Sequence, residues 1–229
     1  MRLDRFLTRR GSHSCKETQR LLVTGQVKVD HQVETNGLRK IDRFSRIELA
    51  TEILQAKESV YLMLHKPASY LSATTDPLHP TVIELIDHPL RNELHLAGRL
   101  DRATTGLLLL TNDGRWSKRI TEPTEEIAKV YRLTTRDPIR PETVAIFTTG
   151  IYFAYEDLTT RPARLEILAT REARLTLHEG RYHQVKRMFH ALGNQVLSLH
   201  REQIGPLVLN DSLLPGSFRH LNAAEVAFF

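Results

Sequence analysis

The stretch GRLDRATTGLLLLTNDG, residues 98–114, decides the fold of this 229-residue chain. Four consecutive leucines at 107–110 predict a strand that is buried on both faces. Residues 104–106 favour an irregular loop before this strand, and TNDG at 111–114 has the composition of a turn. The segment therefore predicts a polar loop that is attached directly to a central strand of a sheet.

Asp101 lies in this loop between Arg99 and Arg102. Nearby cations favour the ionised form of a carboxylate, so Asp101 is available as a nucleophile or a base. From these residues alone, a surface salt bridge to one of the two arginines is the preferred interpretation. Asp113 is better explained as a turn residue, and no carboxylate pair is spaced for metal-assisted phosphodiester hydrolysis.

Two later segments carry further candidate residues. KVYRLTT at 129–135 alternates as a strand, and its Tyr131 is either a core aromatic or a platform for an extruded base whose hydroxyl assists proton transfer. In EGRYHQVKRMFHALGN at 179–194, the apolar side chains share one helical stripe. That stripe consists of Tyr182, Val185, Met188, Phe189 and Leu192.

The polar residues of the same predicted helix have separate expected roles. Lys186 is placed at the edge of the stripe, where it can reach a carboxylate in a cleft, and Arg187 is expected to meet solvent or phosphate. His183 and His190 share a face at i, i+7, a poor spacing for a metal site, with no acidic partner expected nearby. They are interpreted as surface or RNA-facing residues, and no metal site is predicted.

The first quarter of the chain carries the whole positive excess. Residues 1–57 hold 12 Lys and Arg against 7 Asp and Glu, whereas the remaining residues are balanced. A helix from Leu3 that ends at Gly11, a second helix capped by Ser14, and strands at 27–29, near Val33 and within 41–49 are expected. Exposed basic residues of this module are predicted to contact RNA phosphates. They are Arg2, Arg5, Arg9, Arg10, Lys16 and Arg20.

Composition limits the class of protein. The single Cys excludes an intramolecular disulfide and a multi-Cys zinc site, and favours a reducing compartment, the cytoplasm. No apolar run approaches the length of a membrane span. Strand signals with few helices predict an α+β fold whose sheet is mixed and mainly antiparallel, preceded by the small basic module. Polar residues 50–59 are interpreted as a linker, with domains at 1–57 and 58–229.

The motifs resemble two known families. RLDRFL, the serine-led helix start and TGQVKVD are similar to the S4 RNA-binding domain, apart from Cys15 and from Asp30-His31 at the hairpin turn. The family usually has Arg in place of Cys15, so one phosphate contact is expected to be missing. GRLDRATTGLLLLTNDG resembles the signature of the RsuA-type pseudouridine synthases. KVYRLTT, EGRYHQVKRMF and HREQIGPLVL match further motifs of that family in the same order.

This resemblance implies an enzyme that isomerises uridine to pseudouridine in ribosomal RNA without a metal or other cofactor. It implies that Asp101 attacks the target uridine, at the sugar or at the base. Tyr131 would stack on the base, and Lys186 would pair with the aspartate. Arg99 would enter the space that the flipped nucleotide leaves. Further RNA contacts are expected from Arg102, His183, Gln184 and Arg187.

The resemblance also narrows the substrate. The stretch Tyr182–Lys186 and the chain length are more similar to the small-subunit type, which implies 16S rRNA, uridine 516, as free RNA or in an assembly intermediate. A monomer is expected. Two alternatives stay open, namely a large-subunit (23S) enzyme of the same family and a non-catalytic RNA-binding or ribosome-assembly protein. The intact Asp101, Tyr131 and Lys186 argue against the second alternative.

Overall fold

The computed structural model describes residues 1–10, 13–154 and 156–229. The chain divides into two compact units, Met1–Ser59 and Val60–Phe229. The predicted linker at 50–59 is partly wrong, because Glu52–Gln55 forms strand β4 and buries Leu54 in the core of the first unit. Among the described residues, no helix has the length and apolar character that crossing a bilayer requires.

The first unit packs two short helices on a four-stranded sheet. Its elements are α1 Leu3–Arg10, α2 Cys15–Val23, β1 Val27–Val29, β2 Gln32–Val33, β3 Ile47–Leu49 and the strand β4 already named, with sheet order β2-β1-β3-β4. The Ser14 side chain accepts a hydrogen bond from the Glu17 amide at 3.2 Å, which confirms the predicted cap. Within 41–49 only the last three residues form a strand. The predicted helix end at Gly11 lies outside the described residues.

The second unit is built on a nine-stranded sheet. Its strands are β5 Tyr61–Lys66, β6 His95–Leu96, β7 Thr105–Thr111, β8 Lys129–Thr135, β11 Arg164–Ala169, β12 Glu172–Leu177, β13 Val196–Ile204, β14 Leu207–Val208 and β15 Phe218–His220. A separate hairpin pairs β9 Tyr152–Phe153 with β10 Leu158–Thr159. The α-helices are α3 Gly114–Thr121, α4 Glu142–Thr149, α5 Gln184–Ala191 and α6 Ala223–Val226. The 3-10 helices are η1 Val82–Leu85, η2 Arg91–Glu93 and η3 Pro123–Glu125.

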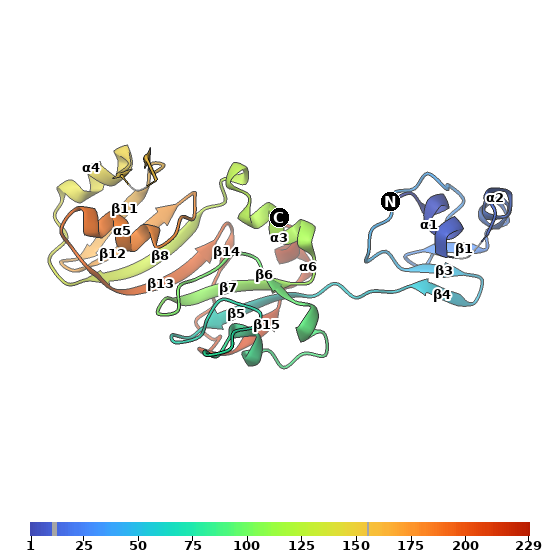
Figure 1. The fold of residues 1–229 in the computed structure, drawn as a ribbon, viewed down its shortest axis with the longest axis horizontal. Helices are drawn as coiled ribbons and strands as arrows, with labels where there is room; N and C mark the ends of the chain where they lie inside the picture. Colours follow the sequence, from blue (N-terminus) through green and yellow to red (C-terminus); the bar gives the residue numbers. More distant parts are fainter. Residues whose placement is uncertain (11–12, 155) are drawn as a thin grey trace. The chain divides into compact units, whose positions relative to one another are not determined.

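The strand order of the large sheet is β11-β12-β8-β13-β7-β5-β15, with β14 beside β13 and β6 beside β7 (Figure 1). Every pairing is antiparallel except that of β13 with β7. The predicted fold class is therefore confirmed, a mixed α+β chain whose sheet is mainly antiparallel. The parallel pair lies near the middle of the sheet and joins the two halves of the unit.

Strand β7 is buried on both faces, as its four leucines predict. Leu107 and Leu109 pack in one cluster with Trp116 of α3, whereas Leu108 and Leu110 belong to a cluster that includes η1. The strand begins at Thr105, so the predicted irregular loop over 104–106 is wrong for its last two residues. The reason is the pairing of this strand end with its neighbours on both sides, β5 and β13.

Helix α3 follows β7 immediately and was not predicted from the sequence. The Asp113 carboxylate accepts hydrogen bonds from the Arg115 and Trp116 amides at 2.9 and 3.3 Å, so this residue caps a helix and does not only form a turn. Helices α4 and α5 pack against the other half of the sheet through Phe147 and Phe189, whose rings meet edge to face with centroids 5.1 Å apart. This packing holds α5 against the sheet.

Candidate active site

Residues of β5 and of the segment after it anchor the loop between β6 and β7. The Lys66 ammonium, at the end of β5, is fully buried and donates to the carbonyl oxygens of Pro67, Arg102 and Thr104 at 3.0, 3.2 and 2.9 Å. The Ser72 hydroxyl donates to the Leu100 carbonyl at 2.7 Å and accepts from its amide at 3.0 Å. Asp101 therefore lies on a loop whose backbone is anchored on both sides of it.

The two ion-pair partners of Asp101 come from a segment much later in the sequence. Lys186 Nζ lies 3.1 Å from Oδ2 of Asp101, and His183 Nε2 lies 3.4 Å from Oδ1. The carboxylate side chain is 26% exposed, so it faces a cleft and not the core. Arg102, one of the two arginines considered as its salt-bridge partner, donates from Nε to the Ser69 carbonyl at 3.2 Å. Both Arg99 and Arg102 are exposed and line the same cleft.

A buried carboxylate fixes the segment before α5. Glu179 accepts hydrogen bonds from Arg181 Nε at 3.0 Å and Gln184 Nε2 at 2.6 Å, and the side-chain Oε1 of Gln184 accepts from the Arg181 backbone amide. His183 then adopts a left-handed backbone conformation with φ +49°, and its ring stacks on Tyr182 at 3.9 Å between centroids. This turn directs the side chains of His183 and Lys186 toward Asp101.

Three expectations for this segment are wrong. Helix α5 begins at Gln184, so Tyr182 is not part of its apolar stripe and is 73% exposed. Gln184 was predicted to face RNA, but its amide is buried and is used by the contacts with Glu179 and Arg181. Arg187 does not extend to solvent, because it pairs with Glu156 at 2.5 Å and its guanidinium covers the Phe153 ring at 3.8 Å. Acidic side chains, one of them from outside the segment, therefore neutralise part of its positive charge.

The cleft that contains Asp101 has a volume of about 680 Å³. Its floor includes Lys129 and Tyr131 of β8 and Arg201 of β13, and Tyr131 also belongs to the hydrophobic core. Burial lowers the pKa of Lys66 to about 8, and the negative charge of Asp101 opposes this shift. Burial, together with the charge of Arg201, lowers the pKa of Lys129 to about 8. Cations thus lie both under the Asp101 loop and on the cleft floor.

The predicted basic residues of the first unit lie on its helical side. Arg5, Arg9, Arg10, Lys16 and Arg20 are exposed, and Arg2 is half-buried beside Asp4, with Arg2 Nε 3.1 Å from Asp4 Oδ1. A groove of about 740 Å³ is lined by side chains of α1 and α2, Arg5 and Arg9 among them. The groove combines these arginines with Asp4 and with neutral polar and apolar side chains.

Sequence reasoning missed the residues that support the site, which are Lys66, Ser69, Ser72 and Glu179. One signal for Lys66 was available, because it is the only charged residue of the apolar strand VYLMLHK and precedes Pro67. The serines carried no signal, since their partners lie about thirty residues away in the sequence. Glu179 bonds the nearby Arg181 and Gln184 side chains, and no local pattern shows that its carboxylate is buried. His183 was expected to be a surface or RNA-facing residue with no acidic partner nearby, whereas its ring reaches Asp101. Among the described residues, no group of three or more His, Cys, Asp or Glu could hold a metal ion.

Comparisons with known proteins agree with this geometry. The model of the family described as RNA pseudouridylate synthase matches residues 60–191. Proteins named ribosomal small subunit pseudouridine synthase A are similar over nearly their whole length. The one from Pseudomonas aeruginosa is 52% identical, with 99% of each chain covered. The one from Vibrio cholerae is 43% identical, covering 99% of this chain and 98% of its own.

A solved structure agrees as well. The crystal structure of a pseudouridylate synthase superposes with a TM-score of 0.72 at 40% identity, covering 99% of this chain and 98% of that one. The family model matches more than half of the chain, and the relatives match nearly all of it. Both comparisons assign the chain to the same family. The chain therefore belongs to the RNA pseudouridylate synthase family and is a pseudouridine synthase.

Proposed function

We propose that the protein converts one uridine of 16S ribosomal RNA, uridine 516, to pseudouridine. The relatives that match 99% of the chain are named as small-subunit enzymes, which favours 16S over 23S rRNA. The observation that carries the chemistry is the contact of Asp101 with Lys186 at 3.1 Å in an open cleft beside Tyr131. The substrate is free 16S rRNA or a small-subunit assembly intermediate, met in the cytoplasm by a monomeric enzyme.

In this proposal Asp101 is the nucleophile. Lys186 and His183 keep the carboxylate oriented toward the cleft, where it can attack the uridine. A lysine supplies this charge as a point and not as a bidentate fork, so the orientation of Asp101 depends on the second contact to His183. The loop anchors at Lys66 and Ser72 hold the backbone of the nucleophile in place while it reacts.

The reacting uridine has to leave its stack to reach Asp101. A cleft of about 680 Å³ accommodates one nucleotide, whereas a base within a helix presents neither C1′ nor C6 to an enzyme. Tyr131 on the cleft floor provides the stacking surface and a hydroxyl for proton transfer. Arg99 and Arg102 on the rim contact the RNA that remains outside and fill the space that the base leaves.

The basic face of the first unit is proposed to be an S4-like RNA clamp. Its exposed cations on α1 and α2 neutralise phosphates and hold the RNA without reading its sequence. Specificity for one uridine then depends on RNA shape around the cleft and on access to it. This separates binding, spread over both units, from chemistry in the second unit.

Mapping of pseudouridine in both ribosomal RNAs of a strain that lacks this protein tests the proposal. We expect the modification to disappear at position 516 of 16S rRNA and to return with a plasmid-borne wild-type copy but not with Asp101→Asn. An unchanged 16S rRNA together with a missing pseudouridine in 23S rRNA would assign the enzyme to the large subunit. Restoration by Asp101→Asn would exclude the catalytic assignment.

A further inference from the structure

Two buried polar atoms lack a hydrogen-bond partner in the described part of the chain, and both belong to the cleft of Asp101. They are Oγ1 of Thr104 and Nη2 of Arg201. A buried donor without a partner is expensive, so a native structure usually supplies one from a ligand, a water or another side chain. Their shared location indicates that these groups are directed at something that enters the cleft.

Arg201 is fixed tightly in place. Its side chain is only 4% exposed, and its Nε donates to the Leu107 carbonyl at 2.8 Å, while Nη2 stays unpaired. Its backbone packs against Gly106, where an added Cβ would lie 2.3 Å from the Arg201 carbonyl oxygen. The guanidinium therefore cannot swing away to find solvent without breaking the junction of β7 and β13.

A second cation faces the cleft from the neighbouring strand. Arg201 is in register with Tyr131 across the pairing of β13 and β8, so the two side chains point to one face of the sheet. Lys129 precedes Tyr131 by two residues and therefore points to the same face. Its pKa is lowered to about 8 by burial and by Arg201. Tyr131 thus lies between two cations, and no carboxylate of the described chain forms an ion pair with either of them.

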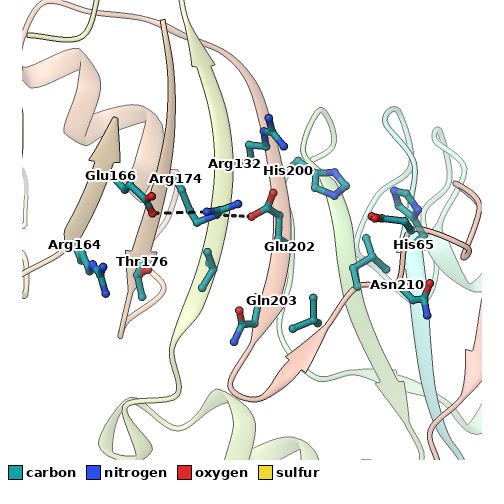
Figure 2. A pocket seen from close by; sticks show the side chains of 14 residues that line it. His65, Arg132, Arg164, Glu166, Arg174, Thr176, His200, Glu202, Gln203 and Asn210 are labelled. Carbon is teal, nitrogen blue, oxygen red and sulfur yellow. Dashed lines mark hydrogen bonds and ion pairs between the residues drawn. The ribbon is translucent and has the colours of Figure 1, made fainter. Parts of the chain in front are cut away.

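The opposite face of the same strands shows the contrast. A pocket of about 650 Å³ there is lined by Arg132, Arg174, Glu166 and Glu202, among others. Figure 2 shows the Arg174 guanidinium between the carboxylates of Glu166 and Glu202, at 3.6 and 2.9 Å. Arg132 pairs with Glu172 at 2.5 Å. These arginines are neutralised within the fold, whereas the cations of the cleft floor are not.

We propose that Arg201 and Lys129 form a cationic subsite that takes a carbonyl oxygen of the target uracil. The subsite would stabilise the negative charge that the ring carries while it is detached. This inference rests on the proposed function. When the C1′–N1 bond breaks, its electron pair stays on the ring and is delocalised onto the carbonyl oxygens. The C1′–C5 bond then forms, C5 loses its proton and N1 gains one, so the isomerisation balances without a co-reactant.

The role of the subsite is the same for attack on the sugar and attack on the base. In both cases electrons move onto the pyrimidine ring and increase the charge of its carbonyl oxygens. Fixed cations in a site of low water content stabilise such developing charge more than they stabilise the neutral uridine. Loss of one of them should therefore slow the chemical step and leave RNA affinity almost unchanged.

The test combines variants with single-atom changes in the substrate. We would measure single-turnover pseudouridine formation by wild type, Lys129→Met and Arg201→Lys on an RNA fragment containing the target uridine. The same fragment would carry 2-thiouridine or 4-thiouridine at that position, or phosphorothioates at its flanking phosphates. Arg132→Met, on the same strand and the opposite face, is the matched control. Thermal unfolding of each variant shows whether it is folded.

We expect Lys129→Met to slow the unmodified fragment by about 10²-fold, with RNA affinity within about twofold, and Arg132→Met to react as wild type. One thio substitution should slow the wild type but have no further effect on Lys129→Met, because the variant lacks the contact. Additive effects, or coupling to a phosphorothioate instead, would overturn the subsite. If Arg201→Lys does not fold, Lys129→Met decides alone. Wild type that leaves both the unmodified fragment and a small-subunit assembly intermediate unreacted would refute the proposed function instead.

Discussion

Asp101 has two partners, Lys186 and His183, and both are more than 80 positions away in the sequence. The pair of arginines beside it in the sequence suggested a local ion pair, but residue spacing does not show which side chains face each other after folding. The motif resemblance named Asp101 and Lys186 correctly as neighbours. The contact with His183 depends on a left-handed backbone at that residue, φ +49°, which no local pattern predicts.

We predict that Asp101→Asn lowers pseudouridine formation by at least about 10³-fold, since an amide cannot act as the nucleophile. RNA affinity should remain within a few-fold of wild type, because the groups that bind phosphate are unaffected. The measurement is single-turnover conversion and filter binding on the same RNA. Asp137→Asn, at an exposed carboxylate paired with Arg136, is the control and should react normally. Comparable loss in both variants would point to a general effect of charge.

Lys66 gives a pH-dependent signature in stability. Its folded pKa is about 8 against 10.5 in the unfolded chain, so between these values the unfolded state binds more protons. Stability contributed through Lys66 therefore rises with pH across this window and is flat below it. The free energy of unfolding of wild type, relative to Lys66→Met, should increase on the order of 3 kcal/mol from pH 8 to 10.5. Parallel curves for the two proteins would show that burial does not lower the pKa of Lys66.

At the scale of elements, strand β7 was predictable and the elements beside it were not. Four leucines in a row indicated the buried strand, because a short continuous run of apolar residues is typical of a strand that is covered on both faces. Its beginning at Thr105 was missed, since the parallel pairing with β13 comes from a segment about ninety residues later. Helix α3 was missed because NDG has the same composition in a turn and in a helix cap, and only the later Trp116 packing separates them.

The junction of β7 and β13 should be intolerant of a side chain at Gly106. Its φ is +109°, and a Cβ would lie 2.3 Å from the Arg201 carbonyl oxygen, so Gly106→Ala forces the two strands apart. We expect a decrease of roughly 2–4 kcal/mol in the free energy of unfolding by urea. The control is Gly114→Ala in α3, where no atom lies within 4 Å of the added Cβ and the change should be nearly neutral. Equal stability of the two variants would contradict the close approach.

At the scale of the whole molecule, charge asymmetry located one basic surface and hid another. The excess of 12 Lys and Arg over 7 Asp and Glu in residues 1–57 pointed to the first unit. The second unit is almost neutral, with 20 Lys and Arg against 19 Asp and Glu. Its cleft nevertheless gathers Lys129, Lys186 and Arg201, and its acids neutralise other arginines such as Arg174 and Arg187. Net charge averages over both faces of a sheet, so the pattern of pairing becomes visible only in three dimensions.

The clamp role of the first unit predicts a salt effect. Replacing Arg5, Arg9 and Lys16 by Ala in the full chain should weaken RNA binding and make the dependence of log K on log salt shallower, by roughly 0.7–0.9 for each phosphate that is no longer neutralised. A control that removes the same charge outside α1 and α2, Lys28, Lys40 and Arg43 to Ala, should change the slope less. Equal slopes for the two triple variants would assign the effect to net charge and not to the helical face.

Our central proposal is that this chain makes one pseudouridine in 16S rRNA through Asp101. Pseudouridine mapping of unmodified 16S and 23S rRNA, each incubated with the purified wild type or with Asp101→Asn, tests it most directly. We expect a single new pseudouridine, at position 516 of 16S rRNA, with wild type and none with the variant. Modification of 23S rRNA alone, or an equal signal with Asp101→Asn, would contradict the proposal.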